Sequence, residues 1–180
     1  MIDGEDKLIQ DAVRGEASAF GLLYDRYQPQ IYRFVAIKVS HREEAEDLTH
    51  QVFLHAWTHV HTYEDVGFPF SSWLYRIARN KVIDHYRTKK NDVPIEDVDE
   101  EQFATSATHD ADLDAKFTLE QVKNAVRKLK PEYQDVIIMR FVEDHSLKDT
   151  AKALEKSEGA IKLMQHRAIK QLQQLLTNNK

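Results

Sequence analysis

The sequence predicts an all-α protein of two small helical domains joined by an acidic, flexible linker. Gly and Pro are scarce, at 5 and 4 of 180 residues, whereas straight-chain residues that lose little rotamer freedom in a helix are common. Apolar residues recur at helical spacing on both sides of residues 91–114. That segment contains nine Asp or Glu and no Lys or Arg, a composition typical of a disordered linker.

The first domain is expected at residues 1–90. Its predicted helices cover residues 18–39, 40–59 and 72–87, with a loop at 61–70 that contains Gly67 and Pro69. Ser40 with Glu43 three residues later forms a capping box, which predicts the start of the second of these helices. Ser71 or Ser72 is expected to cap the third.

The second domain is expected at residues 115–180. Its predicted helices cover residues 117–129, 131–142, 146–154 and 157–176. Pro131 suits the first turn of a helix, where its missing N–H would have no intrahelical partner. Ser146 with Asp149 is a second start of the capping-box kind.

Composition excludes several classes of protein and site. The chain has no Cys, which excludes disulfides, thiol catalysis and cysteine-bound zinc. No apolar run is long enough to span a bilayer and the first residues do not form a signal peptide, so we expect a cytoplasmic protein without membrane insertion. The formal net charge of −5 disfavours unaided DNA binding, which depends largely on neutralising phosphates.

Basic residues are concentrated in the helix that follows the 61–70 loop. One arc of this helix carries Arg76, Arg79, Asn80, Ile83 and Arg87. Trp73 and the aromatic residues of the loop lie directly before it. A cationic track beside aromatic rings suits single-stranded nucleic acid, although a solvated basic face beside core aromatics would give the same pattern.

Two further helices carry candidate binding faces. In the helix at 40–59 the polar face holds Glu43, Asp47, Gln51 and the apolar Leu54, with Phe53 a second apolar candidate. This face suits protein docking, but a solvated face with one stray leucine explains it equally simply. In the last helix Ile161, Met164, Ala168, Leu172 and Leu175 face inward, and Lys162, Leu163, His166, Arg167 and Lys170 face outward. This pattern is typical of a major-groove recognition helix, and of basic helix pairs that never touch DNA.

His55 and His59 have the i, i+4 spacing of a metal-binding pair. They lack the intervening Glu of the H-E-x-x-H motif, and the sequence indicates no third ligand. No Gly-rich phosphate loop, G-x-S-x-G motif or nucleophile–base pair is present. We therefore expect no enzyme activity and no cofactor, with a histidine-liganded metal hydrolase as a distant alternative.

Three stretches in this order resemble a bacterial extracytoplasmic-function (ECF) sigma factor of the sigma-70 family. They are EEAEDLTHQVFLHAW, FSSWLYRIARNKVIDHYR and LKPEYQDVIIMRFVEDHSLKDTAKALEKSEGAIKLMQHRAIKQL. The resemblance implies an initiation factor that binds core RNA polymerase and promoter DNA and that an anti-sigma factor sequesters. It also implies that the acidic linker threads through polymerase toward the RNA path. The main alternative is a stand-alone helix-turn-helix regulator, which is expected to bind a palindromic duplex by itself.

The resemblance also implies roles for individual residues. By this resemblance, the polymerase clamp is contacted by Asp47, Leu48, Gln51 and Phe53. The resemblance likewise implies that the melted strand is read by Trp73, Arg76, Arg79, Asn80 and Arg87, with the 61–72 loop capturing a flipped base. It implies that the upstream duplex is contacted by Lys162, Leu163, His166 and Arg167. This chain departs from the family at His50-Gln51, usually Gln-Glu, and at Glu155-Lys156, usually Gly and an apolar residue. A non-Gly residue in a left-handed turn costs about 1 kcal/mol or more, so we expect this turn to be built differently.

Overall fold

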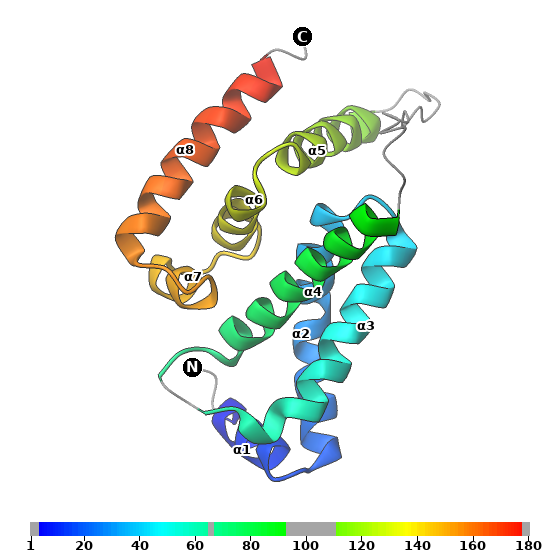
Figure 1. Ribbon diagram of the computed structural model, residues 1–180, viewed down its shortest axis with the longest axis vertical. Helices are drawn as coiled ribbons and strands as arrows, with labels where there is room; N and C mark the ends of the chain where they lie inside the picture. The colour runs from blue at the N-terminus through cyan, green and yellow to red at the C-terminus, as the bar shows by residue number, and fades with distance from the viewer. Residues whose placement is uncertain (1–3, 65–66, 93–110, 178–180) are drawn as a thin grey trace.

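The computed structural model describes residues 4–64, 67–92 and 111–177 (Figure 1). Its elements are α1 (Glu5–Val13), α2 (Ala17–Lys38), α3 (Arg42–His59), η1 (Val60–Thr62), α4 (Phe70–Asp92), α5 (Ala111–Arg127), α6 (Pro131–Ile137), η2 (Ile138–Val142), α7 (Leu147–Ala153) and α8 (Glu158–Thr177). The described ranges contain no strand, which confirms the all-α fold class. Within these ranges, no helix combines the length and the apolar character that a membrane span requires.

Several helix boundaries differ from the sequence prediction. The Ser40–Glu43 capping box is wrong, because α3 begins at Arg42 and its N-cap residue, His41, makes no side-chain cap hydrogen bond. Ser71 and Ser72 are buried inside α4, which starts at Phe70. α1 was not predicted as a separate helix, α4 extends to Asp92, and α5 begins at Ala111, inside the expected linker. The rest of that linker, residues 93–110, lies outside the described residues.

Other local predictions are confirmed. Pro131 occupies the first turn of α6. Ser146 is the N-cap of α7, and its Oγ accepts a hydrogen bond from the Asp149 N–H at 3.0 Å. The chain between them continues from α6 into the π-helical segment η2, where Glu143 N donates to Ile138 O at 3.0 Å.

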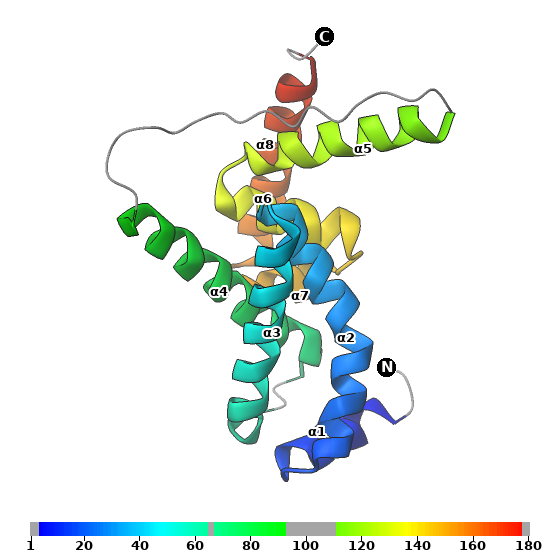
Figure 2. The ribbon, with the colours of Figure 1, turned by 90° about the vertical axis from the view of Figure 1, so that its right-hand side faces the viewer.

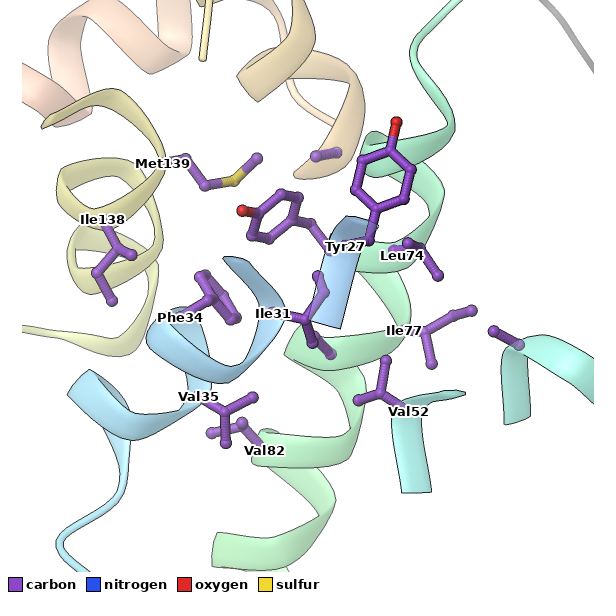
Figure 3. Packing of buried hydrophobic residues seen from close by; sticks show 14 of the residues in the cluster. Tyr27, Ile31, Phe34, Val35, Val52, Leu74, Ile77, Val82, Ile138 and Met139 are labelled. Atoms are coloured by element: carbon purple, nitrogen blue, oxygen red, sulfur yellow. The ribbon is translucent and has the colours of Figure 1, made fainter. Parts of the chain in front are cut away.

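The core of the first domain lies between α2, α3 and α4. Ile31 and Phe34 from α2, Val52 from α3, and Leu74 from α4 are fully buried against one another in the same cluster (Figure 3). In the second domain the inward stripe of α8 is as predicted. Ile161 and Ala168 are fully buried, and Met164, Leu172 and Leu175 pack partly buried against the core.

The two domains share one continuous apolar cluster. Ile138 and Met139 of η2 are fully buried and belong to the same cluster as Phe34 (Figure 3). α7 packs against α4, and α5 packs against α2. Figures 1 and 2 show α6 and α7 near α4 and away from α1, with α8 on the outer side. The second domain therefore covers part of α4, the helix that carries the predicted nucleic-acid face.

Candidate nucleic-acid interface

The amphipathic character of α4 places its basic residues on the surface. Leu74, Tyr75 and Ala78 are buried on one side of the helix. On the other side Arg76, Asn80 and Arg87 are exposed, and Arg79 and Trp73 are partly buried. The structure therefore brings the predicted single-strand-binding residues to one helix surface, spread over four turns.

The aromatic loop before α4 divides into core and surface residues. Phe70 is buried, and its ring centroid lies 5.1 Å from that of Tyr63 and 5.3 Å from that of Trp73. Phe68 is only partly buried and borders a cavity of about 250 Å³ together with Trp73 and Arg76. Planar rings and a guanidinium around a cavity of this kind suit an unstacked base.

This cavity has a wall from the second domain. Lys152 of α7 lines it, and its ammonium lies 4.4 Å from the centroid of the Phe68 ring. Lys148, one turn earlier, lies 5.6 Å from the same centroid. Both distances are within the range of cation–π attraction. The sequence could not indicate these contacts, because nothing local links α7 to the loop.

Two of the α4 arginines already have carboxylate partners from the second domain. Arg79 Nε lies 3.2 Å from Asp135 Oδ2, and Arg76 Nη1 lies 3.2 Å from Glu155 Oε1. Arg87 lies 3.9 Å from Asp84 of its own helix. The predicted phosphate-binding cations are therefore partly neutralised within the chain.

A second hollow lies between α3 and α4. It has a volume of about 360 Å³ and is bordered by Trp73, Arg76, Asn80 and the stacked rings of His55 and His59, 4.1 Å apart. Burial, with the neighbouring charges of His59 and Lys81, lowers the pKa of His55. His59 is exposed. Within the described residues no group of three His, Cys, Asp or Glu side chains is placed to hold a metal ion.

The outward face of α3 differs in one respect from its prediction. Asp47 and Gln51 are exposed, and Leu54 is 65% exposed. Phe53, however, is only 4% exposed, and its ring packs edge-on against Tyr24 at 4.7 Å. The suggestion that Phe53 is a second apolar residue on the polar face is wrong, because Tyr24 of α2 draws it into the core. Leu48, another of the residues expected to dock on polymerase, is also buried.

The outer face of α8 is open to solvent. Lys162, His166 and Arg167 are exposed, and Leu163 is 49% exposed. The Ser157 Oγ accepts a hydrogen bond from the Ala160 N–H at 3.1 Å and so caps the start of this helix. All four predicted duplex-binding residues therefore lie together on an accessible helix face, unlike those of α4.

The turn between α7 and α8 contains a left-handed residue that is not glycine. Glu155 has φ of 54°, so the expectation of a differently built turn is wrong. The backbone closes with Lys156 N donating to Ala151 O at 2.9 Å. The conformation costs about 1 kcal/mol for a residue with a Cβ. Its two side chains make ion pairs, Glu155 with Arg76 and Lys156 with Glu132, both at 3.2 Å.

Comparison with known families matches both domains. The family model for sigma-70 region 2 matches residues 23–91, and the model for sigma-70 region 4 matches residues 119–172. The ECF RNA polymerase sigma factor BldN of Streptomyces coelicolor is 36% identical over 178 residues, which cover 96% of this chain and 66% of that relative. SigW of Bacillus subtilis, also an ECF RNA polymerase sigma factor, is 30% identical over 94% of this chain and 95% of its own.

Solved structures show the same fold. CnrH in complex with the cytosolic domain of CnrY superposes with a TM-score of 0.76 and 23% identity, covering 99% of this chain and all of CnrH. The sigma factor RpoE in complex with the anti-sigma factor NepR, from Bartonella quintana, superposes with a TM-score of 0.67 and 25% identity. The latter alignment covers 89% of this chain and 98% of RpoE.

Proposed function

Because the chain belongs to the ECF family of RNA polymerase sigma factors, we propose that it binds core RNA polymerase, directs it to specific promoters and helps to melt their DNA. The observation that carries this proposal is that two separate surfaces suit two different forms of DNA. A cationic and aromatic surface on α4 suits single strands, and a separate exposed face on α8 suits a duplex groove. A promoter that is melted at one element and double-stranded at another presents both a single strand and a duplex groove.

Region 2, residues 1–90 in this proposal, engages polymerase through α3. Asp47 and Gln51 supply the polar contacts, and the exposed Leu54 supplies an apolar anchor at their centre. Leu48 and Phe53 act from the buried side by fixing α3 on α2 and α4. This assignment keeps all four family positions on the clamp-binding helix but gives direct contact to two of them.

The same region reads the melted strand through α4. Arg76, Arg79 and Arg87 contact phosphates, Asn80 contacts a base edge, and Trp73 stacks on a base. The cavity beside Phe68 receives a base turned out of the stack. Opening the duplex is favoured because each unstacked base gains an aromatic surface on the protein.

Region 4, residues 115–180 in this proposal, reads the further-upstream duplex through α8. Lys162 and Arg167 supply charge for phosphates or guanine edges, His166 adds a hydrogen-bonding ring, and Leu163 adds apolar contact with a thymine methyl group. Residues 91–114 connect the regions and carry the acidic charge that keeps the overall balance negative. DNA binding then depends on delivery by polymerase.

Partners follow from the same proposal. The chain works in the cytoplasm with core polymerase, which supplies the catalytic centre, so the chain itself needs no cofactor. An anti-sigma factor is a further partner, since RpoE was solved with the anti-sigma factor NepR. We propose that such a factor holds this chain away from polymerase until it is released.

The test is run-off transcription with purified core polymerase on a pool of genomic fragments, with and without the full chain. We expect new, discrete start sites only when the chain is present, and co-migration of the chain with core polymerase. Absence of both would overturn the proposal. A chain that instead binds duplex fragments tightly without polymerase would be the stand-alone regulator.

A further inference from the structure

Region 4 lies on the part of region 2 that the proposed function assigns to single-stranded DNA. Among the contacts that cross from one to the other are Arg79 with Asp135, Arg76 with Glu155, Phe68 with Lys152, and Ser72 Oγ donating to the Asp149 carbonyl oxygen at 3.5 Å. Each of these contacts uses a group of α4 or of the loop before it. None of these groups is left to bind a nucleotide without first losing its protein partner.

The chemistry of these contacts imitates a nucleic acid. A carboxylate beside a guanidinium takes the place that a phosphate would occupy. A Lys152 ammonium over the Phe68 ring covers a face on which a base would stack. We infer that region 4 is the occupant of the single-strand-reading surface of region 2 in the free protein, so that the closed chain and the DNA-engaged chain exclude one another. This inference rests on the function proposed above.

The closed arrangement has a second anchor on the α2 side. Lys38 of α2 pairs with Asp135, and both side chains are 2% exposed. Arg33 holds Glu143 with two hydrogen bonds, of 3.0 and 2.8 Å. Arg127 of α5 donates to the carbonyl oxygens of Ile37 and Ala36 at 3.0 and 3.2 Å, at the C-terminal end of α2. An interface with buried charges and satisfied carbonyls is a built contact between the domains.

Asp135 connects the two sides of this interface. One of its carboxylate oxygens faces the buried Lys38, and the other faces Arg79 on the nucleic-acid surface. When a phosphate takes Arg79, Asp135 keeps only Lys38. Binding of a strand therefore weakens the anchor as well as displacing the cover.

Glu155 connects the cover to the unusual turn. A glycine would adopt φ of 54° without strain, but it would carry no carboxylate for Arg76. The strained residue thus supplies an interdomain contact that the relaxed residue cannot. By contrast Lys162, Leu163, His166 and Arg167 on α8 stay exposed, so the cover masks the part of the single-strand surface around Arg76 and Arg79 and leaves the duplex-reading face free.

The first test measures binding of the free full-length chain to a fluorescein-labelled single-stranded 12-mer of randomised sequence. Glu155→Gly removes the carboxylate and the strain together. Asp144→Gly is the matched control, because Asp144 is exposed and left-handed, with φ of 52°, but does not pair with Arg76. We expect Glu155→Gly to bind about fivefold more tightly than Asp144→Gly. Equal affinities of the two variants would overturn the inference.

The second test measures the arrangement directly. The chain has no Cys, so spin labels can be placed at Asp25→Cys on α2 and Gln173→Cys on α8, both exposed positions. We expect one narrow distance distribution in the labelled parent, and a broader, longer one after Glu155→Gly or Asp135→Asn. A broad distribution in the parent would refute the closed state.

The two proposals fail separately. A narrow distribution with no run-off activity would leave the closed state standing and overturn the proposed function. Run-off activity with a broad distance distribution in the parent would support the proposed function and overturn the closed state. Circular dichroism of each variant distinguishes domain separation from unfolding, because separated domains keep their helical signal.

Discussion

The Lys38 ammonium of α2 and the Asp135 carboxylate of α6 form a salt bridge between the domains, although 97 positions separate them in the chain. Burial lowers the pKa of Lys38, while Asp135 acts in the opposite direction. Removing two charges from water is costly, and their attraction repays the cost only when the pair stays intact. The domains therefore dock well only when both charged partners are present or both are replaced, because a single remaining charge would be buried without a partner.

The first prediction concerns this pair. Asp135→Ala leaves the Lys38 ammonium buried without its carboxylate and should weaken docking of the domains by about 3–5 kcal/mol. Hydrogen exchange of the backbone amides at the end of α2 and in α6 should speed up accordingly. The control is the double variant Lys38→Met with Asp135→Leu, which replaces the ion pair with apolar contact and should recover most of the protection. Equal exchange in the single and double variants would contradict this account.

The second prediction concerns the start of the helix-turn-helix. Ser146→Ala removes the oxygen that accepts the Asp149 N–H, and it should lower the free energy of unfolding by about 1 kcal/mol. Urea denaturation followed by circular dichroism measures the change. Ser18→Ala is the control, because Ser18 is exposed within the first turns of α2 and Ala favours a helix. A loss as large for Ser18 would show that the cap is not the cause.

The third prediction concerns pH. His145 packs edge-on against the Tyr75 ring, with centroids 4.8 Å apart, and burial lowers the pKa of His145. The charged groups that influence it are Asp149, Glu143, Arg140 and Asp144. Because its folded pKa lies below the unfolded value of about 6.5, the neutral ring is favoured in the fold. The stabilisation is complete above that value and is lost as the pH falls through the lower, folded pKa.

His145→Gln removes this titration. The free energy of unfolding of this variant should therefore change less between pH 7.5 and 5 than that of the parent. The slopes of unfolding free energy against pH should differ by at most about 1.4 kcal/mol per pH unit. Urea denaturation at a series of pH values measures both slopes. Because the chain contains nine His, the comparison of the two slopes is the informative quantity, not either slope alone. Parallel curves would rule out a role for His145.

The fourth prediction separates the two surfaces. Lys162→Ala should weaken recognition of the upstream duplex element by about 1–3 kcal/mol and leave binding to core polymerase intact. Asp47→Lys should weaken binding to core polymerase and leave recognition of the duplex element intact, because a reversed charge on α3 opposes docking on polymerase. Run-off transcription and co-migration with core polymerase measure the two effects. Loss of polymerase binding in Lys162→Ala would show that the faces are wrongly assigned.

Local patterns predicted the parts of the fold that depend on local physics. The inward stripe of α8 and the Ser146 cap follow from spacing within a few residues, and both are confirmed. The Ser40–Glu43 cap fails because two helix starts one residue apart are nearly equivalent in sequence, and the N-cap is His41. Phe53 fails for a tertiary reason, since only the position of Tyr24 on another helix decides which way the ring turns.

The candidate site shows the same limit. The basic arc of α4 was predictable from periodicity, but its partners Asp135 and Glu155 lie 56 and 79 positions further along the chain. No short-range pattern pairs charges over such separations. The family resemblance predicted which helices carry the reading surfaces, and only the folded chain shows that α7 packs against α4.

The pairing of Arg76 and Arg79 with carboxylates has a consequence for ionic strength. A free arginine that binds a phosphate releases condensed cations from the strand, and this release makes single-strand affinity fall with salt by about 0.7 in log–log slope per contact. In the closed chain the two displaced carboxylates take up cations from solution and offset part of that release. Wild-type protein should therefore show a shallower salt dependence than Glu155→Gly, and titration of the labelled 12-mer between low and high KCl measures both slopes.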